Sequence, residues 1–347
     1  MINMYVGGTI GALVLGVLLI GWWFASRKPR KKVCVVLGRD VASHLQAYEA
    51  FKEELLRQEL TKTCSFDTYL LDLLDKSHVI VECNAVLSAK PDLIVSFGTL
   101  CTYTLKRCMD ERRMHDIPLV FLSVFNPVGG GIIKSFEEPG GCITGVQLEG
   151  AEHAQIAAVA LLAKPAMRCV LLPYEVLSDL DGRIALIVDE MQQFFHEHGI
   201  RAEVVPVYGV KEVATRLEKM LDGADTLIIS EMDGLTQVTT EVARLCSAKG
   251  VTFVCATRDG AELGAAVAFV ADTNAIGKKA VDLIHDIVVS RRRPGGIPIA
   301  FVENTRTLFI NKDAATQQNC PSDLDALRTR VLHDPRMSWL QHRIKLV

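Results

Sequence analysis

The chain has 347 residues, of which 49% are hydrophobic, and a formal net charge of −3. It is too long for one small domain, and without a basic stripe of interleaved aromatics it gives no indication of a nucleic-acid partner. The ten cysteines lack the spacing of a zinc site, and most lie within apolar runs, for example Cys34, Cys142, Cys169 and Cys255. This argues against a disulfide framework and weakly favours a reducing compartment.

The first predicted element is a transmembrane anchor at residues 1–26. These residues carry no charged side chain, and Met4–Ala25 as a helix would span roughly 33 Å, enough for the hydrocarbon core of a bilayer. Trp22 and Trp23 lie where an interfacial aromatic belt is expected. A cleaved signal peptide is the alternative, but its usual charged start and A-x-A cleavage site are missing.

A basic linker, residues 27–32, follows the anchor. It contains five lysine and arginine residues, whereas no basic residue precedes the anchor. The positive-inside rule therefore places the domain that follows in the cytoplasm.

Strand-like and helix-like segments alternate from Val33 onward. The first half predicts strands at Val33–Leu37, Asp92–Phe97, Leu119–Phe125 and Cys142–Val146, with helices at His44–Leu60, Ser77–Ala89 and Thr99–Asp110. The second half predicts strands at Arg168–Leu172, Ala202–Val207, Thr226–Ser230, Thr252–Ala256 and Ala266–Val270, with helices at Asp179–His198, Lys211–Leu221, Gly234–Lys249 and Asn274–Ser290.

This rhythm predicts an α/β protein with two doubly wound, Rossmann-like lobes. Strands separated by helices indicate parallel βαβ units, and two sets of about five strands favour two lobes over one large sheet. The tail, residues 313–347, changes character because Gln317–Asn319 and Pro321 interrupt the pattern. We expect it to be a surface appendage.

The sequence contains none of the familiar catalytic or nucleotide-binding motifs. It has no phosphate-binding loop, no G-x-G-x-x-G after the first strand, no G-x-S-x-G and no H-E-x-x-H. His196 and His198 lie two apart, on different sides of a helix, so a solvated helix end is preferred to a metal site. We therefore predict a binding protein with no catalytic residues, no metal and no cofactor.

The stretch from Ile117 to Val146 suggests a ligand-binding mouth. An apolar strand ends at Asn126-Pro127, and three glycines follow. In open α/β sheets, ligands bind beyond the carboxyl ends of the strands. Thr99, which follows the strand at Asp92–Phe97, is a second candidate. The simpler roles are a turn for Asn126 and a helix N-cap for Thr99.

The second half supplies three more candidates at strand ends: Glu175, Asp233 and Asp259. Their carboxylates would suit the ammonium group of a small polar ligand. The alternatives are an exposed loop for Glu175, helix capping for Asp233 and a surface ion pair with Arg258 for Asp259.

The run IPLVFLSVFNPVGGGIIKSFEEPGGCITGV (residues 117–146) resembles the signature of the ABC-transporter substrate-binding family whose better-known members bind aromatic amino acids. The resemblance continues through LLPYEVLSDLDG and GAELGAAVAFVADTNAIGKKA to LFINKDAA. It covers residues 33–315, and its most specific part is the PGG-x-x-TGV block. Asn126 stands where the family usually has Asp, and Cys142 replaces the Asn of PGGN.

The resemblance implies a type I periplasmic-binding-protein fold, with two lobes that close on a ligand like a hinge. We expect lobe 1 at residues 33–147 and 273–296, and lobe 2 at residues 148–272 and 297–312. By resemblance, Thr99, Asn126, Glu175 and Asp233 occupy pocket-lining positions, and the implied partners are an amino-acid-like ligand and an ABC permease. Because Asn126 lacks the usual negative charge, the choice of ligand is open.

The leading hypothesis is a membrane-anchored, single-pass solute-binding protein of an ABC importer. A ligand sensor with the same hinge and a cytoplasm-facing α/β enzyme are the alternatives. Import requires the soluble domain outside the cell membrane, whereas the basic linker and the cysteines favour the cytoplasm. The resemblance tips the expectation toward an extracytoplasmic domain, and the cytoplasmic side stays open.

Overall fold

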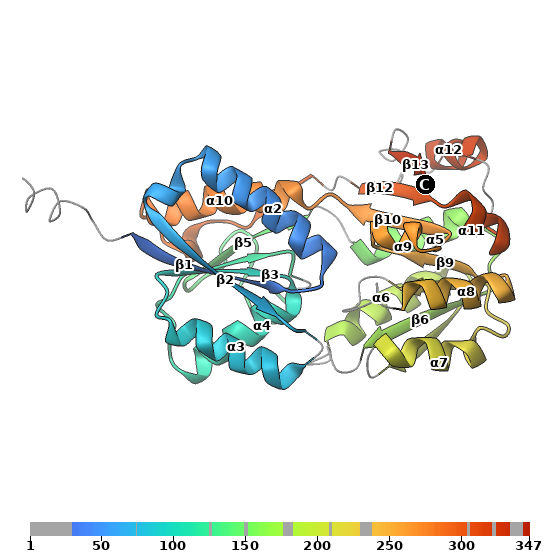
Figure 1. Cartoon of the computed structure of the whole chain (residues 1–347), viewed down its shortest axis with the longest axis horizontal. Coiled ribbons are helices and arrows are strands. Elements are labelled where there is room, and N and C mark those ends of the chain that lie inside the picture. Colours follow the sequence, from blue (N-terminus) through green and yellow to red (C-terminus); the bar gives the residue numbers. More distant parts are fainter. Residues whose placement is uncertain are drawn as a thin grey trace, which may run out of the picture.

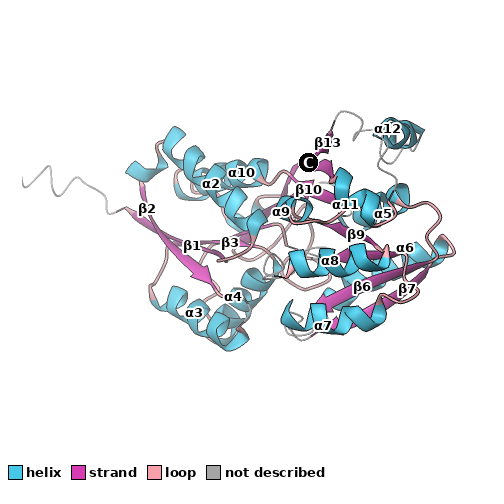
Figure 2. Cartoon of the chain, turned by 45° about the vertical axis from the view of Figure 1, so that its right-hand side comes forward, coloured by secondary structure: helices cyan, strands magenta, loops and turns pink. Residues whose placement is uncertain are grey.

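The computed structural model describes residues 30–73, 75–124, 127–148, 152–175, 183–207, 210–229, 238–303, 306–320, 324–333 and 343–347. They form two α/β lobes, each built on one sheet with helices on both faces (Figures 1 and 2). This confirms the predicted two-lobed α/β fold. The predicted anchor at residues 1–26 lies outside the described residues. Within the described part, no helix has the length and apolar character needed to cross a membrane.

The first lobe is built on a six-stranded parallel sheet in the order β11-β5-β4-β3-β1-β2. Its strands are β1 (Lys31–Gly38), β2 (Cys64–Leu71), β3 (Leu93–Phe97), β4 (Leu119–Leu122), β5 (Ile143–Leu148) and β11 (Ala300–Val302). Val33, Val35 and Leu37 of β1 belong to one apolar cluster, and Cys34 and Val36 to another. Because β1 is covered on both faces, its sequence is a continuous apolar run.

Helices cover both faces of this sheet. α2 (Ala42–Arg57) and α10 (Asn274–Val288) pack together on one face, and α3 (Lys76–Ser88) and α4 (Thr99–Glu111) lie on the other (Figure 1). α10 follows a strand of the second lobe in the chain, so the first lobe is completed by a segment far along the sequence.

The second lobe is built on a seven-stranded sheet in the order β13-β12-β10-β9-β8-β6-β7. Its strands are β6 (Cys169–Glu175), β7 (Arg201–Val207), β8 (Thr226–Ile229), β9 (Thr252–Cys255), β10 (Val267–Ala271), β12 (Arg306–Ile310) and β13 (Ile344–Leu346). The pairing of β10 with β12 is antiparallel, and the other pairs are parallel.

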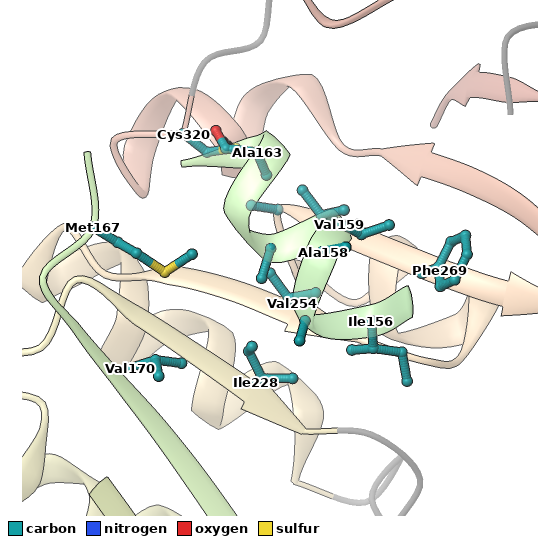
Figure 3. Packing of buried hydrophobic residues seen from close by; sticks show 14 of the residues in the cluster. Ile156, Ala158, Val159, Ala163, Met167, Val170, Ile228, Val254, Phe269 and Cys320 are labelled. Atoms are coloured by element: carbon teal, nitrogen blue, oxygen red, sulfur yellow. Dashed lines mark hydrogen bonds between the residues drawn. The ribbon is translucent and has the colours of Figure 1, made fainter. Parts of the chain in front are cut away.

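Two helix layers cover this second sheet. α5 (Glu152–Ala163), α6 (Arg183–Glu197) and α12 (Leu324–His333) contribute to one apolar cluster; α7 (Val210–Met220), α8 (Thr239–Lys249) and α9 (Arg258–Glu262) contribute to the other. Figure 3 shows Ile156 and Val159 of α5 among Ile228, Val254 and Phe269 of the sheet. α5 was not predicted, and its central position in this cluster makes it part of the core.

The chain passes between the lobes three times: from β5 to α5, from β10 to α10, and from β11 to β12. The carboxyl ends of β5 and β11 therefore point toward the second lobe, and the carboxyl end of β10 points toward the first. β5 and β11 run parallel to the rest of their sheet, and β10 runs parallel to β9, β8, β6 and β7. The carboxyl edges of both sheets therefore face the junction.

Two expected boundaries need correction. Residues 297–312 were assigned to the second lobe, and β12 lies there as expected, but β11 pairs with β5 and so belongs to the first. The tail, residues 313–347, was expected to be a surface appendage. Instead, α11 (Lys312–Gln317) leads to buried Gln318, whose side chain accepts from Phe253 N–H (2.9 Å) and donates to the Gly264 carbonyl (2.8 Å). β13 then extends the sheet, so the tail is part of the second lobe.

The Pro-Gly-Gly block, which belongs to the most specific part of the resemblance, has a packing role. Residues 139–141 precede β5 and lie against a second Pro-Gly-Gly segment, residues 294–296. Gly140 N–H donates to the Gly295 carbonyl (3.0 Å), and a Cβ on Gly295 would lie 2.4 Å from the Gly141 carbonyl oxygen. This contact is at the amino end of β5, away from the edge that faces the other lobe.

Candidate functional site

Each sheet has one point at which the order of its strands reverses. In the first lobe, the chain leaves β1 for β2 on one side and then places β3, β4 and β5 on the other. In the second lobe, β6 has the same position between β7 and β8. Open α/β sheets bind ligands beyond the carboxyl ends of the strands at such switch points. Because both edges face the junction, the two switch points define one candidate site between the lobes.

His44 lies at the switch point of the first lobe. It is in the first turn of α2, and Gly38 N–H, at the end of β1, donates to its Nδ1 (3.1 Å). Burial lowers the pKa of His44 to about 4, and no charged group of the described residues contributes to this shift. The imidazole is therefore neutral near pH 7. Since Nδ1 accepts a hydrogen bond, the proton is on Nε2.

Gly98, at the end of β3, lies against the imidazole of His44. Its φ and ψ are 78° and 173°, a region that only glycine occupies readily. A Cβ on Gly98 would lie 2.2 Å from His44 Nε2. A side chain at this position would displace the histidine, so the glycine is needed both for the turn and for the contact.

The turn around Gly98 is fixed by three hydrogen bonds. Gly98 N–H donates to the Leu122 carbonyl (2.8 Å), and the Thr102 hydroxyl donates to the Gly98 carbonyl (2.8 Å). The buried Ser96 and Thr102 hydroxyls also share a hydrogen bond (2.7 Å). This network holds the end of β3 and the start of α4 in a single geometry.

The structure places three of the five predicted site residues. Thr99 is the first residue of α4, partly buried and next to Gly98, so it lies at the first switch point. Glu175 is the last residue of β6 and lies at the second. Asp259 is exposed in α9, after β9, one strand beyond β8. The alternative role suggested for Asp259 was an ion pair with Arg258. Arg258 instead forms an ion pair with Glu262 (3.0 Å).

Asn126 and Asp233 lie outside the described residues. The strand before Asn126 ends at Leu122, earlier than predicted, because Ser123 has a positive φ of 53°. Ser123 N–H donates to the Val146 carbonyl (3.0 Å), and the Gln147 amide donates to the Val124 carbonyl. These bonds fix the end of β4 at the same edge as Gly98. The roles predicted for Asn126 and Asp233 stay predictions.

The described residues contain no cluster of three or more metal-ligating side chains. The His198 ring is bonded to the Phe194 carbonyl (2.7 Å), as suits a helix end. The thiols of Cys246 and Cys255 are held in their protonated, less reactive form, because burial raises the pKa of each to about 12.

Residues 42–326 match the family described as ABC transporter substrate binding protein. A tyrosine-binding protein from Clostridioides difficile (strain R20291) is 23% identical over 237 residues, which are 65% of this chain and 63% of that protein. The chain thus spans less than two thirds of the length of this relative.

Solved structures share the fold at low sequence identity. An ABC domain in complex with L-Trp from Streptococcus pneumonia has a TM-score of 0.75 at 17% identity, covering 86% of this chain and 98% of that one. A conserved domain protein from Vibrio cholerae has a TM-score of 0.77 at 17% identity, covering 92% and 100%. At these identities, the likeness establishes the two-lobed fold.

Proposed function

The chain belongs to the ABC transporter substrate-binding protein family, and we propose that it is the binding component of an ABC importer that closes its two lobes on an amino-acid-like ligand. A substrate-binding protein is not an enzyme, in agreement with the prediction made from the absent catalytic motifs. The rest of the proposal concerns the ligand, the permease and the side of the membrane.

One observation carries the binding proposal: the switch points of both sheets lie on edges that face the junction of the lobes. A ligand held there contacts Thr99 and Gly98 from one lobe and Glu175 from the other. Each lobe contributes part of the contact surface, so ligand binding favours the closed arrangement. A permease would then distinguish the closed form from the open one.

An aromatic amino acid is the ligand class we propose. Support comes from two relatives, one described as tyrosine-binding and one solved with L-Trp. The predicted acidic residues of the second lobe, Glu175 and Asp233, suit an ammonium group. Because position 126 carries Asn in place of the family's usual Asp, only the second lobe would supply a carboxylate to pair with the ammonium group.

The binding proposal predicts that L-tyrosine or L-tryptophan stabilises the protein. A ligand at 100 times its Kd adds about 2.7 kcal/mol to the free energy of unfolding, because it binds the folded state only. Thermal unfolding of the detergent-purified protein, with and without each amino acid, measures this as a rise in Tm. D-tyrosine and L-lysine are the controls. A folded protein whose Tm responds to no amino acid would contradict the proposal.

We also propose that residues 1–26 anchor the protein and that the domain is extracytoplasmic, where an importer meets its ligand. The cysteines do not oppose this, because nine of the ten are buried. Thiols buried in apolar surroundings are poorly accessible and inert, even in an oxidising compartment. Alkaline phosphatase and fluorescent-protein fusions at the C-terminus test the side: phosphatase activity is expected. Fluorescence alone would place the domain inside and favour a ligand sensor.

A further inference from the structure

His44 is a polar side chain that the sequence-based search for ligand contacts missed. Its Nδ1 is occupied by Gly38 N–H (3.1 Å), so Nε2 carries the only proton of the ring. Among the described residues, no hydrogen bond to Nε2 is formed. The imidazole therefore keeps one hydrogen-bond donor in reserve at the switch point of the first lobe.

The surroundings of His44 are built to hold the ring at this place. Gly98 has no side chain, and the space that its Cβ would occupy is taken by Nε2 and Cε1 of His44. On the other side, a Cβ on Gly38 would lie 3.2 Å from His44 Nδ1. Two glycines, each at the carboxyl end of a central strand, thus leave room for one imidazole.

The turn that carries His44 is also tied to a crossover between the lobes. Thr273, which lies between β10 and α10, is buried, and its hydroxyl donates to the carbonyl of Ser43 (2.9 Å). The residue next to His44 is therefore bonded to a segment that leads into the second lobe.

We propose that His44 is a specificity-determining residue whose Nε2–H donates to a carboxylate oxygen of the ligand. This rests on the proposed binding function and adds an orientation to it. A neutral ring with an occupied Nδ1 offers a donor and no acceptor, so it selects an oxygen acceptor and rejects an ammonium group. The ligand's carboxylate then faces the first lobe, and its ammonium faces the carboxylates predicted in the second lobe.

The test compares ligands with and without the carboxylate, using titration calorimetry on the full chain. The probes are L-tyrosine and L-tryptophan, each against its amine, tyramine or tryptamine. We expect His44→Ala to lower the affinity for the amino acid by about 10- to 100-fold, because a hydrogen bond to a charged group is lost. The affinity for the amine should change by less than about threefold, because the amine lacks the carboxylate that would accept this hydrogen bond.

Two further variants keep the result interpretable. His44→Gln retains an amide N–H donor, so it should lose less affinity for the amino acid than His44→Ala. If the alanine variant fails to fold, the affinity of His44→Gln for the amino acid, compared with that for the amine, tests the proposal instead. His115→Ala removes an exposed histidine of the same lobe and should bind like the parent. A parent that binds neither amino acid would overturn the proposed function and the role of His44 with it. A parent that binds, with a folded His44→Ala variant of equal affinity and equal preference over the amine, would overturn the role of His44 alone.

Discussion

Replacing Gly277 by alanine is expected to lower the free energy of unfolding by about 3 kcal/mol, because α10 and α2 touch at this residue without room for a methyl group. A Cβ on Gly277 would lie 1.9 Å from the Ala47 carbonyl oxygen and 2.9 Å from Phe51 N. These are backbone atoms of α2 and cannot move aside as a side chain would. In a helix without this contact, the same change would add about 1 kcal/mol.

Chemical unfolding followed by circular dichroism measures the loss, and Tm should fall by about 6 to 12 °C. Gly296→Ala is the matched control, because a Cβ there has no neighbour within 4 Å. We expect it to change stability by less than about 0.5 kcal/mol. A Gly277→Ala protein as stable as the parent would show that the helices are further apart. Since α2 carries His44, the destabilised variant should also bind its ligand more weakly.

The alternation of strands and helices was predictable because most strands are covered on both faces. β1, β3 and β4 are almost wholly buried, so their sequences are short apolar runs bounded by turns. β2 was missed for the opposite reason. It lies at the edge of its sheet, and its central residues are partly or fully exposed, so the apolar run is absent.

α5 escaped the sequence pattern because its environment hides the helical period. Residues 156–160 are all buried, so no polar face marks a repeat of 3.6 residues. The tail was misjudged because polar residues were equated with the surface. Gln318 is fully buried, and its amide bonds the backbone of β9 and of Gly264. A single sequence does not distinguish such a buried amide from a loop residue.

The sequence predicts where the candidate site lies, but it names only some of the residues that the structure places there. The rule that ligands bind at strand ends predicts Thr99 and Glu175 as site residues, and the structure places each at the carboxyl end of a strand at a switch point. His44 was predicted only as the first residue of a helix, because a single histidine after a short turn matches no motif. The signal available was the pair of glycines, Gly38 and Gly98, each ending a strand. Only the fold brings them to either side of one ring.

Replacing Gly98 by alanine should lower the free energy of unfolding by about 3 kcal/mol and abolish the rise in Tm caused by the ligand. Two effects add: the backbone angles of Gly98 suit only glycine, and the new methyl group would lie 2.2 Å from His44 Nε2. Gly131→Ala separates them, because Gly131 also has a positive φ (69°) but no neighbour within 4 Å of its Cβ. The free energy of unfolding of that control should fall by about 1 kcal/mol.

A double-mutant cycle identifies the part of this loss that belongs to His44. Removing the imidazole with His44→Ala frees the space that the methyl group needs, so Gly98→Ala should cost less in that background by at least about 1 kcal/mol. The remaining cost reflects the backbone angles of Gly98, which only glycine occupies readily. Additive losses would mean that ring and glycine do not share the space. A coupled loss, together with lost ligand response in both single variants, would establish that β1, β3 and α2 hold one imidazole at the junction of the lobes.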